Sequence, residues 1–300
     1  MARRYFTLDV FTGTALAGNP LAVVLDCDGL DDRRMQQIAR EFNLSETVFV
    51  FDPRNAVNTA RLRIFTPTLE LPFAGHPTVG AACLIAHDRA PGQLAAQDVR
   101  VVLEEGVGDV ICTVRHRKGQ ALAATFDLPR LPKRLESALP SKFEIGVGLG
   151  LAPDEIGFRR HEPSLFSAGV PYLFVPVRSL DALARAWPRA MPWGVDTGPA
   201  TYVYTDEVME AGSAYHARMF GGGWGVVEDP ATGSAAAAFA GVALAFDRPD
   251  DGEHVLSIEQ GFEMGRPSRI ALGFEVAGGQ LRSASIGGDT VIVASGVLEL

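Results

Sequence analysis

Cysteine is scarce in this chain of 300 residues. Its three cysteines, Cys27, Cys83 and Cys112, lie far apart and include no C-x-x-C pair. An odd, dispersed set argues against a disulfide framework and against a zinc site. No two histidines have metal-ligand spacing, so we expect no metal. This cysteine usage fits a reducing compartment, and we expect a cytoplasmic protein.

Long apolar runs and basic patches are also missing. The longest nearly unbroken apolar stretch, residues 235–246, is too short to span a bilayer. The first residues lack the apolar core of a signal peptide. With 27 basic and 36 acidic residues the net charge is −9, which repels phosphate backbones. We therefore expect neither a membrane nor a nucleic acid as partner.

The remaining composition is that of a folded globular protein. Apolar residues make up 47% of the chain and charged residues 21%, and its length suggests two domains. Short segments rich in Val, Ile, Phe and Thr predict strands in both halves. They are residues 4–11, 21–25, 46–51, 59–65, 98–104 and 108–115, then 172–177, 200–204, 214–220, 254–260, 269–275 and 290–294. Amphipathic spacing predicts a helix over 31–42, and a further helix is expected over 179–187.

Two other predicted helices, 77–87 and 234–246, are apolar on every side and should be buried all round. The many short strands are the material that could surround them. We therefore predict an α+β fold of two pseudo-symmetric domains. Each is a curved, mostly antiparallel sheet wrapped around a central apolar helix. The proline-rich segment 129–141 is the expected linker between an N-terminal domain, 1–128, and a C-terminal domain, 142–289.

A glycine-containing turn precedes each apolar helix, with Gly75-His76 in the first and Gly233-Ser234 in the second. A helix N-terminus carries unpaired N–H groups and partial positive charge, and glycine lets a ligand approach the backbone. Two such turns, facing each other across an interdomain cleft, could bind a carboxylate. The alternative is that Gly75 and Gly233 only allow tight turns. The residues alone leave both readings open.

Two titratable residues occupy these turns. His76 lies beside the first proposed anion site, although a lone histidine is often only structural. Asp229 begins the second turn and follows Glu228. Adjacent carboxylates in different environments are one route to acid/base chemistry, and a solvated turn is the alternative.

Glu46 begins a predicted strand and shares one face of it with Val48 and Val50. If that face is turned to the core, Glu46 points into an apolar environment. Burial of this kind raises a carboxyl pKa toward the range useful for proton transfer at neutral pH. The alternative is an exposed strand end with a solvated glutamate.

Several blocks of sequence are recognisable together. They are residues 5–12, 18–23, 42–47, 63–67, 70–78, 228–236 and 260–268. In this order they resemble the phenazine-biosynthesis PhzF-like family over nearly the whole chain. The family has the fold of diaminopimelate epimerase, with the active site between two domains, and its members are commonly homodimers. The resemblance also implies that the C-terminal strand, 290–300, returns to complete the first domain.

The resemblance implies an isomerase that works without a cofactor on a small carboxylic acid, trans-2,3-dihydro-3-hydroxyanthranilate, by moving a proton from C3 to C1. The family's essential glutamate matches Glu46, and its supporting residues match His76, Asp229 and Ser234. Diaminopimelate epimerase instead uses two cysteines at the helix starts. This chain has none there, so two-thiol chemistry is not expected.

The matched residues do not define the substrate. Phe73, Trp224 and Tyr215 are the candidates for walls that bind and select it, beside Gly75 and Gly233. One alternative is therefore an isomerase or epimerase of another small amino or hydroxy acid. A second is a non-catalytic binding protein that keeps the fold. A cysteine-dependent racemase is a third, weaker alternative.

Overall fold

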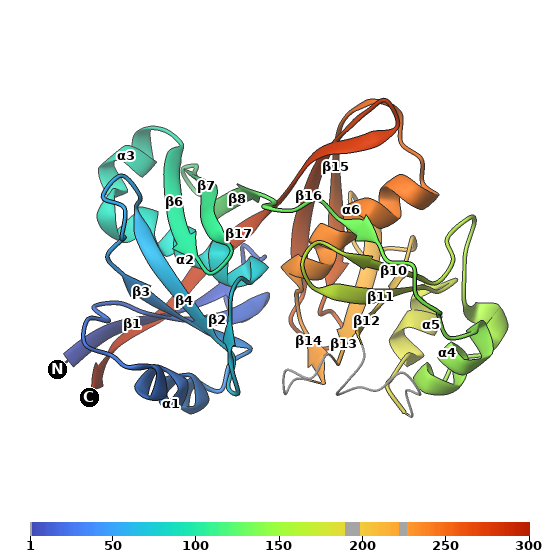
Figure 1. The fold of residues 1–300 in the computed structure, drawn as a ribbon, viewed down its shortest axis with the longest axis horizontal. Coiled ribbons are helices and arrows are strands. Elements are labelled where there is room, and N and C mark those ends of the chain that lie inside the picture. The colour runs from blue at the N-terminus through green and yellow to red at the C-terminus, as the bar shows by residue number, and fades with distance from the viewer. Residues whose placement is uncertain (1, 190–198, 222–226) are drawn as a thin grey trace. The chain divides into compact units, whose positions relative to one another are not determined.

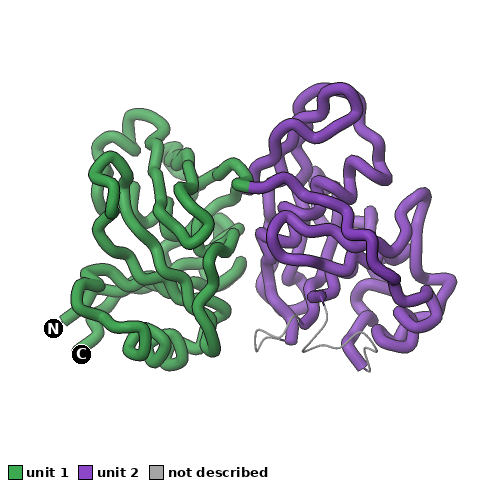
Figure 2. The backbone as a smooth tube through the Cα atoms, in the orientation of Figure 1, with its two compact units in different colours: residues 1–129, 287–300 green, residues 130–286 purple. Residues whose placement is uncertain are grey.

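The computed structural model describes residues 2–189, 199–221 and 227–300 (Figure 1). The chain divides into two compact units, the first made of residues 1–129 and 287–300 and the second of 130–286 (Figure 2). The long strand β17 (Gln280–Glu299) begins in the second unit and ends in the first. No helix in the described ranges combines the length and apolar character that crossing a membrane requires.

The first unit is built on a ring of eight strands. They are β1 (Ala2–Val10), β2 (Asn19–Val24), β3 (Glu46–Phe51), β4 (Ala60–Phe65), β6 (Val99–Glu105), β7 (Gly108–His116), β8 (Leu122–Asp127) and the second part of β17. Each strand pairs with the next in this order, and β17 pairs with both β8 and β1. The sheet therefore closes into a barrel, where the sequence led us to expect only a curved sheet. A short strand, β5 (Glu70–Leu71), pairs with β4.

Helix α2 (Gly75–Arg89) lies against the barrel strands, contacting β1, β2, β3, β6, β7 and β8. Every residue from Gly75 to Ala86 is buried, as an all-round apolar surface requires. The helix begins two residues before the expected Pro77, so His76 belongs to its first turn. Proline is tolerated in that turn because its missing N–H would have no helical partner. The short helix α3 (Pro91–Ala96) follows and contacts β7.

Helix α1 (Asp32–Phe42) packs on the other face of β3. Its Met35, Ile38 and Ala39 form one apolar cluster with Phe49 and with aromatic residues of β3 and β4. Because side chains alternate along a strand, the opposite face of β3 carries Glu46 and the buried Val48 and Val50. That face is the one turned toward α2, so the core decides where Glu46 points.

The second unit holds the remaining strands. They are β9 (Lys133–Arg134), β10 (Ser164–Ser167), β11 (Pro171–Pro176), β12 (Ala200–Thr205), β13 (Tyr215–Phe220), β14 (Glu228–Asp229), β15 (Gly252–Gln260) and β16 (Ser268–Ala277). The pairings run β9–β10–β11–β12–β13–β15–β16, and β14 adds to β13. The pairs β11–β12 and β13–β15 are parallel, as are β2–β3 and β4–β6 in the first unit.

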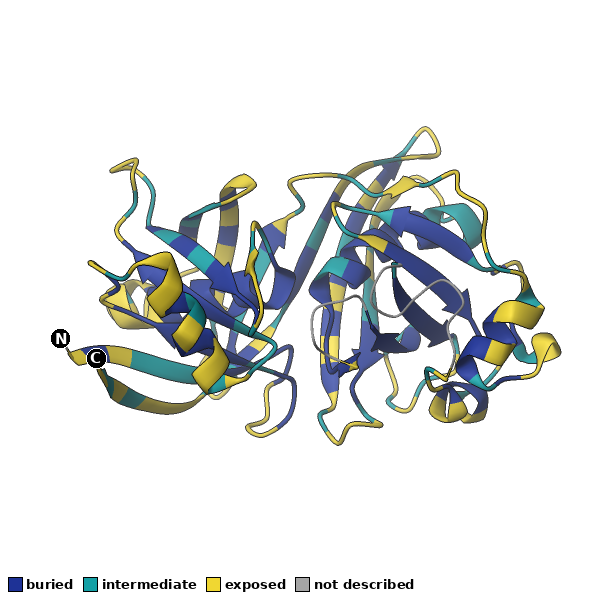
Figure 3. Cartoon of the chain, turned by 60° about the horizontal axis from the view of Figure 1, so that its bottom comes forward, coloured by how far each residue is buried: buried dark blue, intermediate teal, exposed yellow. Residues whose placement is uncertain are grey.

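Helix α6 (Gly233–Phe246) packs against β9, β10, β11 and β16 and is buried from Ala235 to Ala243. The ring of Phe239 meets Tyr204 and Tyr215 edge-on, with centroids 4.9 and 4.8 Å apart. Helices α2 and α6 consist mostly of buried residues, while more than half of the residues of α1 are exposed (Figure 3). Two shorter helices, α4 (Lys142–Leu149) and α5 (Leu180–Arg185), pack on the second unit's other apolar cluster.

Candidate functional site

Glu46 and His76 meet inside the first unit. Glu46 is the first residue of β3, His76 is the second residue of α2, and His76 Nε2 lies 3.5 Å from Glu46 Oε2. The Glu46 side chain is 14% exposed and the His76 side chain 5%. The solvated glutamate that an exposed strand end would give is therefore not what the structure shows.

The His76 imidazole is neutral at physiological pH. Burial lowers the pKa of His76 to about 3, because the charged form would lose its hydration. A neutral imidazole has one N–H donor and one acceptor nitrogen. At Nε2 it can therefore interact with either protonation state of a neighbouring carboxyl group, according to its tautomer.

In the second unit, Asp229 is held at the turn before α6. Its Oδ2 accepts a hydrogen bond of 2.7 Å from the Thr232 hydroxyl. Gln260 at the end of β15 braces the same turn, because its amide donates to the Asp229 carbonyl at 2.7 Å and to the Thr232 hydroxyl at 3.0 Å. Its Oε1 accepts from the Thr232 backbone N–H. Thr232 and Gln260 thus fix the position of the Asp229 carboxylate.

Ser234 is the second residue of α6, the position that His76 holds in α2. Its Oγ lies 2.6 Å from the hydroxyl of Tyr172 on β11. Gly75 and Gly233 are the first residues of the two helices, and both are buried. Neither helix start has a hydrogen bond from a capping side chain, as the predicted anion site requires.

Glu228 differs from its neighbour Asp229. It forms a buried bidentate ion pair with Arg218 of β13, with N–O distances of 2.8 and 2.9 Å. The Arg218 guanidinium also donates to the carbonyl groups of Leu183, Ala184 and Ala186. The two adjacent carboxylates thus have separate partners: Glu228 joins an internal ion pair and Asp229 the turn.

The three residues predicted to form the walls of the substrate site lie in different places. Phe73 is partly buried just before α2 and packs edge-on against Phe126, with centroids 5.6 Å apart. Tyr215 donates a hydrogen bond of 2.6 Å to Asp247, the C-cap residue that follows α6. A helix of this length spans about 20 Å. Tyr215 therefore lies at the opposite end of α6 from Ser234, away from the proposed substrate site. Trp224 lies outside the described residues.

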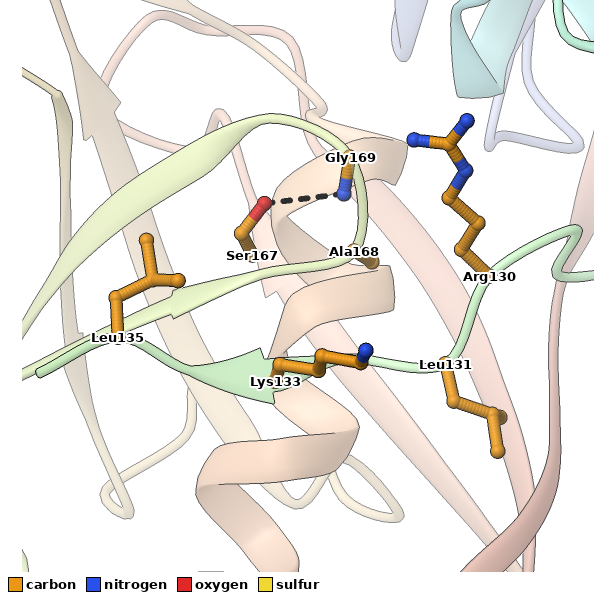
Figure 4. A pocket seen from close by; sticks show the side chains of 7 residues that line it. All are labelled: Arg130, Leu131, Lys133, Leu135, Ser167, Ala168 and Gly169. Carbon is orange, nitrogen blue, oxygen red and sulfur yellow. Dashed lines mark hydrogen bonds between the residues drawn. The ribbon is translucent and has the colours of Figure 1, made fainter.

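Three residues of these clusters were not expected from the sequence, namely Tyr172, Thr232 and Gln260. Gln260 is the first residue of the block 260–268, which carries part of the family resemblance. That block was the sequence signal that could have indicated its role. The structure also contains a pocket of about 530 Å³ in the second unit. Figure 4 shows it between the segment entering β9, with Arg130, Leu131 and Lys133, and the turn after β10. None of the predicted site residues within the described ranges lines it.

Comparisons with known proteins agree with these observations. The family model described as "Phenazine biosynthesis-like protein" matches residues 8–296. An uncharacterized isomerase from Mesorhizobium japonicum is 52% identical, covering 99% of this chain and 98% of its own. The trans-2,3-dihydro-3-hydroxyanthranilate isomerase of Pseudomonas aeruginosa is 36% identical over 98% of each chain.

Among solved structures, the phenazine biosynthesis protein of the PhzF family from Bacillus anthracis superposes with a TM-score of 0.87 at 25% identity, covering both chains fully. The resemblance drawn from the sequence blocks is thereby confirmed. The chain has the PhzF fold, both relatives named above are isomerases, and the chain belongs to the PhzF family of phenazine biosynthesis-like proteins.

Proposed function

We propose that this protein is a cofactor-independent isomerase that shifts a proton on a small cyclic amino or hydroxy carboxylic acid. Trans-2,3-dihydro-3-hydroxyanthranilate, named for the Pseudomonas aeruginosa relative, is the first candidate substrate. Glu46 as carboxylate takes the C3 proton, and as carboxylic acid it returns that proton to C1. Atoms and charge balance within this single transfer, so no co-reactant is required.

The contact between Glu46 and His76 carries the proposal. A base that must keep a proton and return it needs surroundings that exclude water, because otherwise the proton exchanges with solvent. Glu46 is largely buried, and its neighbour His76 is neutral. The imidazole can donate to the carboxylate form and accept from the acid form, which suits a carboxyl that alternates between them.

The second unit supplies the other groups of the proposal. Asp229 and Ser234 would bind the substrate amine or hydroxyl, and backbone N–H groups at Gly75, His76, Gly233 and Ser234 would bind its carboxylate. The assignment of both clusters to one substrate in an interdomain cleft is part of the proposal. So are the pseudo-symmetry of the two units, each around its central helix, a homodimeric state and a cytoplasmic location.

Proton transfer followed by NMR tests this function. The purified protein is incubated with trans-2,3-dihydro-3-hydroxyanthranilate in D₂O while the ring protons are followed. We expect loss of the C3 proton signal as product forms. Glu46→Gln should reduce the rate by at least about 100-fold, since a positioned acid/base group contributes that much. Glu41→Gln is the matched control, because Glu41 is an exposed glutamate on α1.

The possible outcomes of this experiment distinguish the alternatives. Near-normal turnover in Glu46→Gln would refute the role of Glu46. No reaction with the wild type would reject this substrate, and other small amino and hydroxy acids would then be screened for loss of a C–H proton signal and appearance of an isomer. Absence of isomerisation across that set would favour a binding protein that keeps the fold.

A further inference from the structure

Glu105 is a buried carboxyl group that the proposed reaction does not use. It ends strand β6, which contacts α2. Its Oε1 lies 2.8 Å from the hydroxyl of Thr78, in the first turns of α2, and its Oε2 is buried without a hydrogen-bond partner in the described residues. Within the same described ranges no Lys or Arg side chain forms an ion pair with it.

The Thr78 hydroxyl has two neighbours and one proton. It lies 2.8 Å from the carbonyl oxygen of Ala74 and equally close to the Glu105 carboxyl. A carbonyl oxygen can only accept, so when Thr78 donates to Ala74 the carboxyl group must donate to Thr78. Only the carboxylic acid form has an O–H to donate. Burial supports this state, because it raises the pKa of Glu105 to about 8, an effect that the Thr78 contact only partly offsets.

Gly106, the residue after Glu105, contacts the chain just before the first turn of α2. A Cβ on Gly106 would lie 2.8 Å from Cα of Pro72 and 2.9 Å from its oxygen, so only glycine fits. The end of β6 thus contacts Pro72 before the turn and Thr78 after it. Gly75 and His76 lie between these two contacts, and the helix start has no capping side chain of its own.

We propose that Glu105 is a positioning residue, a carboxylic acid that donates to Thr78 and thereby holds the first turn of α2, with the His76 imidazole, against Glu46. The catalytic part of this inference rests on the function proposed above. When Glu105 loses its proton, the donated hydrogen bond is lost and a buried negative charge appears beside the turn. The turn then shifts, and so does the His76 ring.

Four titratable groups near Glu105 have pKa values that keep their charge constant around pH 8. Cys83 of α2 and Cys112 of β7 are buried, and burial raises the pKa of Cys83 to about 12 and that of Cys112 further. His76 itself stays neutral because its pKa lies near 3. Glu104, the preceding residue, accepts from the backbone of Arg54 and Asn55, which lowers its pKa. Asp127, at the end of β8, is a further acidic residue near Cys112.

NMR titration tests the inference without a substrate. The side-chain carboxyl carbons and the His76 ring are observed from pH 5 to 10, with signals assigned from Glu105→Gln and His76→Gln. We expect one carboxyl signal to titrate near pH 8, and the His76 ring signals to move with the same midpoint. Both changes should vanish in Glu105→Gln and persist in Glu104→Gln, the matched control. A Glu105 midpoint near 4.5, or a His76 signal that stays still, would overturn the proposal.

Turnover provides the second measurement once a substrate is found. We expect kcat in wild type to fall several-fold above pH 8 and this decline to disappear in Glu105→Gln, whose amide can still donate to Thr78. Glu105→Ala, which cannot donate, should lower kcat at every pH with little change in KM. Loss of turnover in both variants, with unchanged His76 signals, would assign Glu105 a purely structural role. If no substrate is turned over, the NMR titration still decides whether Glu105 positions His76.

Discussion

The Nε2 atom of His76 lies 3.5 Å from Oε2 of Glu46, and the two side chains come from the start of a helix and the start of a strand 30 residues apart. This contact joins a neutral base to a largely buried carboxyl group. Its first consequence concerns stability as a function of pH.

The free energy of unfolding should fall in acid because His76 resists protonation. Its pKa is about 3 in the folded protein against 6.5 for an ordinary histidine. The unfolded chain therefore binds more protons between these values, and the contribution of His76, complete above pH 6.5, is lost as pH falls toward 3. The slope is about 1.4 kcal/mol per pH unit. Urea unfolding of wild type and His76→Gln at pH 7, 6 and 5 measures it; parallel pH dependences would contradict the prediction.

The hydrogen bond between Tyr172 and Ser234 should appear as a coupling energy. Their oxygens are 2.6 Å apart, and Tyr172 is fully buried. Tyr172→Phe and Ser234→Ala should each lower the free energy of unfolding, and the double variant should cost less than their sum by about 1 kcal/mol. A double-mutant cycle by urea unfolding gives this value. Additive single effects would show that the contact contributes nothing to stability.

The buried pair of Arg218 and Glu228 predicts a large loss on removing one charge. Both N–O distances are below 3 Å, and the guanidinium is otherwise enclosed by backbone carbonyl groups. Glu228→Gln should reduce the free energy of unfolding by about 3–5 kcal/mol, because it leaves a buried cation without its partner. Arg185→Gln, which removes an exposed ion pair with Glu155, should cost less than about 1 kcal/mol. Equal losses in the two variants would reject this account.

Two helical glycines should respond oppositely to alanine. A Cβ on Gly241 of α6 would lie 2.6 Å from the Phe166 ring and 3.3 Å from Pro132, whereas one on Gly92 of α3 would meet nothing. Gly241→Ala should therefore cost about 1–3 kcal/mol by overpacking. Gly92→Ala should gain up to about 1 kcal/mol from helix propensity. Thermal unfolding of both variants measures the contrast, and a stabilised Gly241→Ala would disprove the packing argument.

Local signals in the sequence were sufficient for many of the elements, although they did not predict β8, β10, α3 or α4. Apolar residues on every side of 77–87 and 234–246 predicted two buried helices, and the structure extends them only to Gly75–Arg89 and Gly233–Phe246. The strand ending at Phe51 was predicted with the bounds it has. Such features depend on neighbours in the chain, so composition and periodicity determine them. The block resemblance added the family, which the comparisons confirmed.

Tertiary structure decided which side chains meet. Glu46 could have been solvated from its pattern alone, and it is largely buried because Phe49 and Phe51 pack on α1 and turn the alternate face of β3 to α2. Tyr215 lies at the C-terminal end of α6, where its hydroxyl donates a hydrogen bond to Asp247. The barrel closes because β17, at the end of the chain, pairs with β1 at its beginning. Each outcome depends on contacts between distant segments, which local propensity and periodicity cannot register.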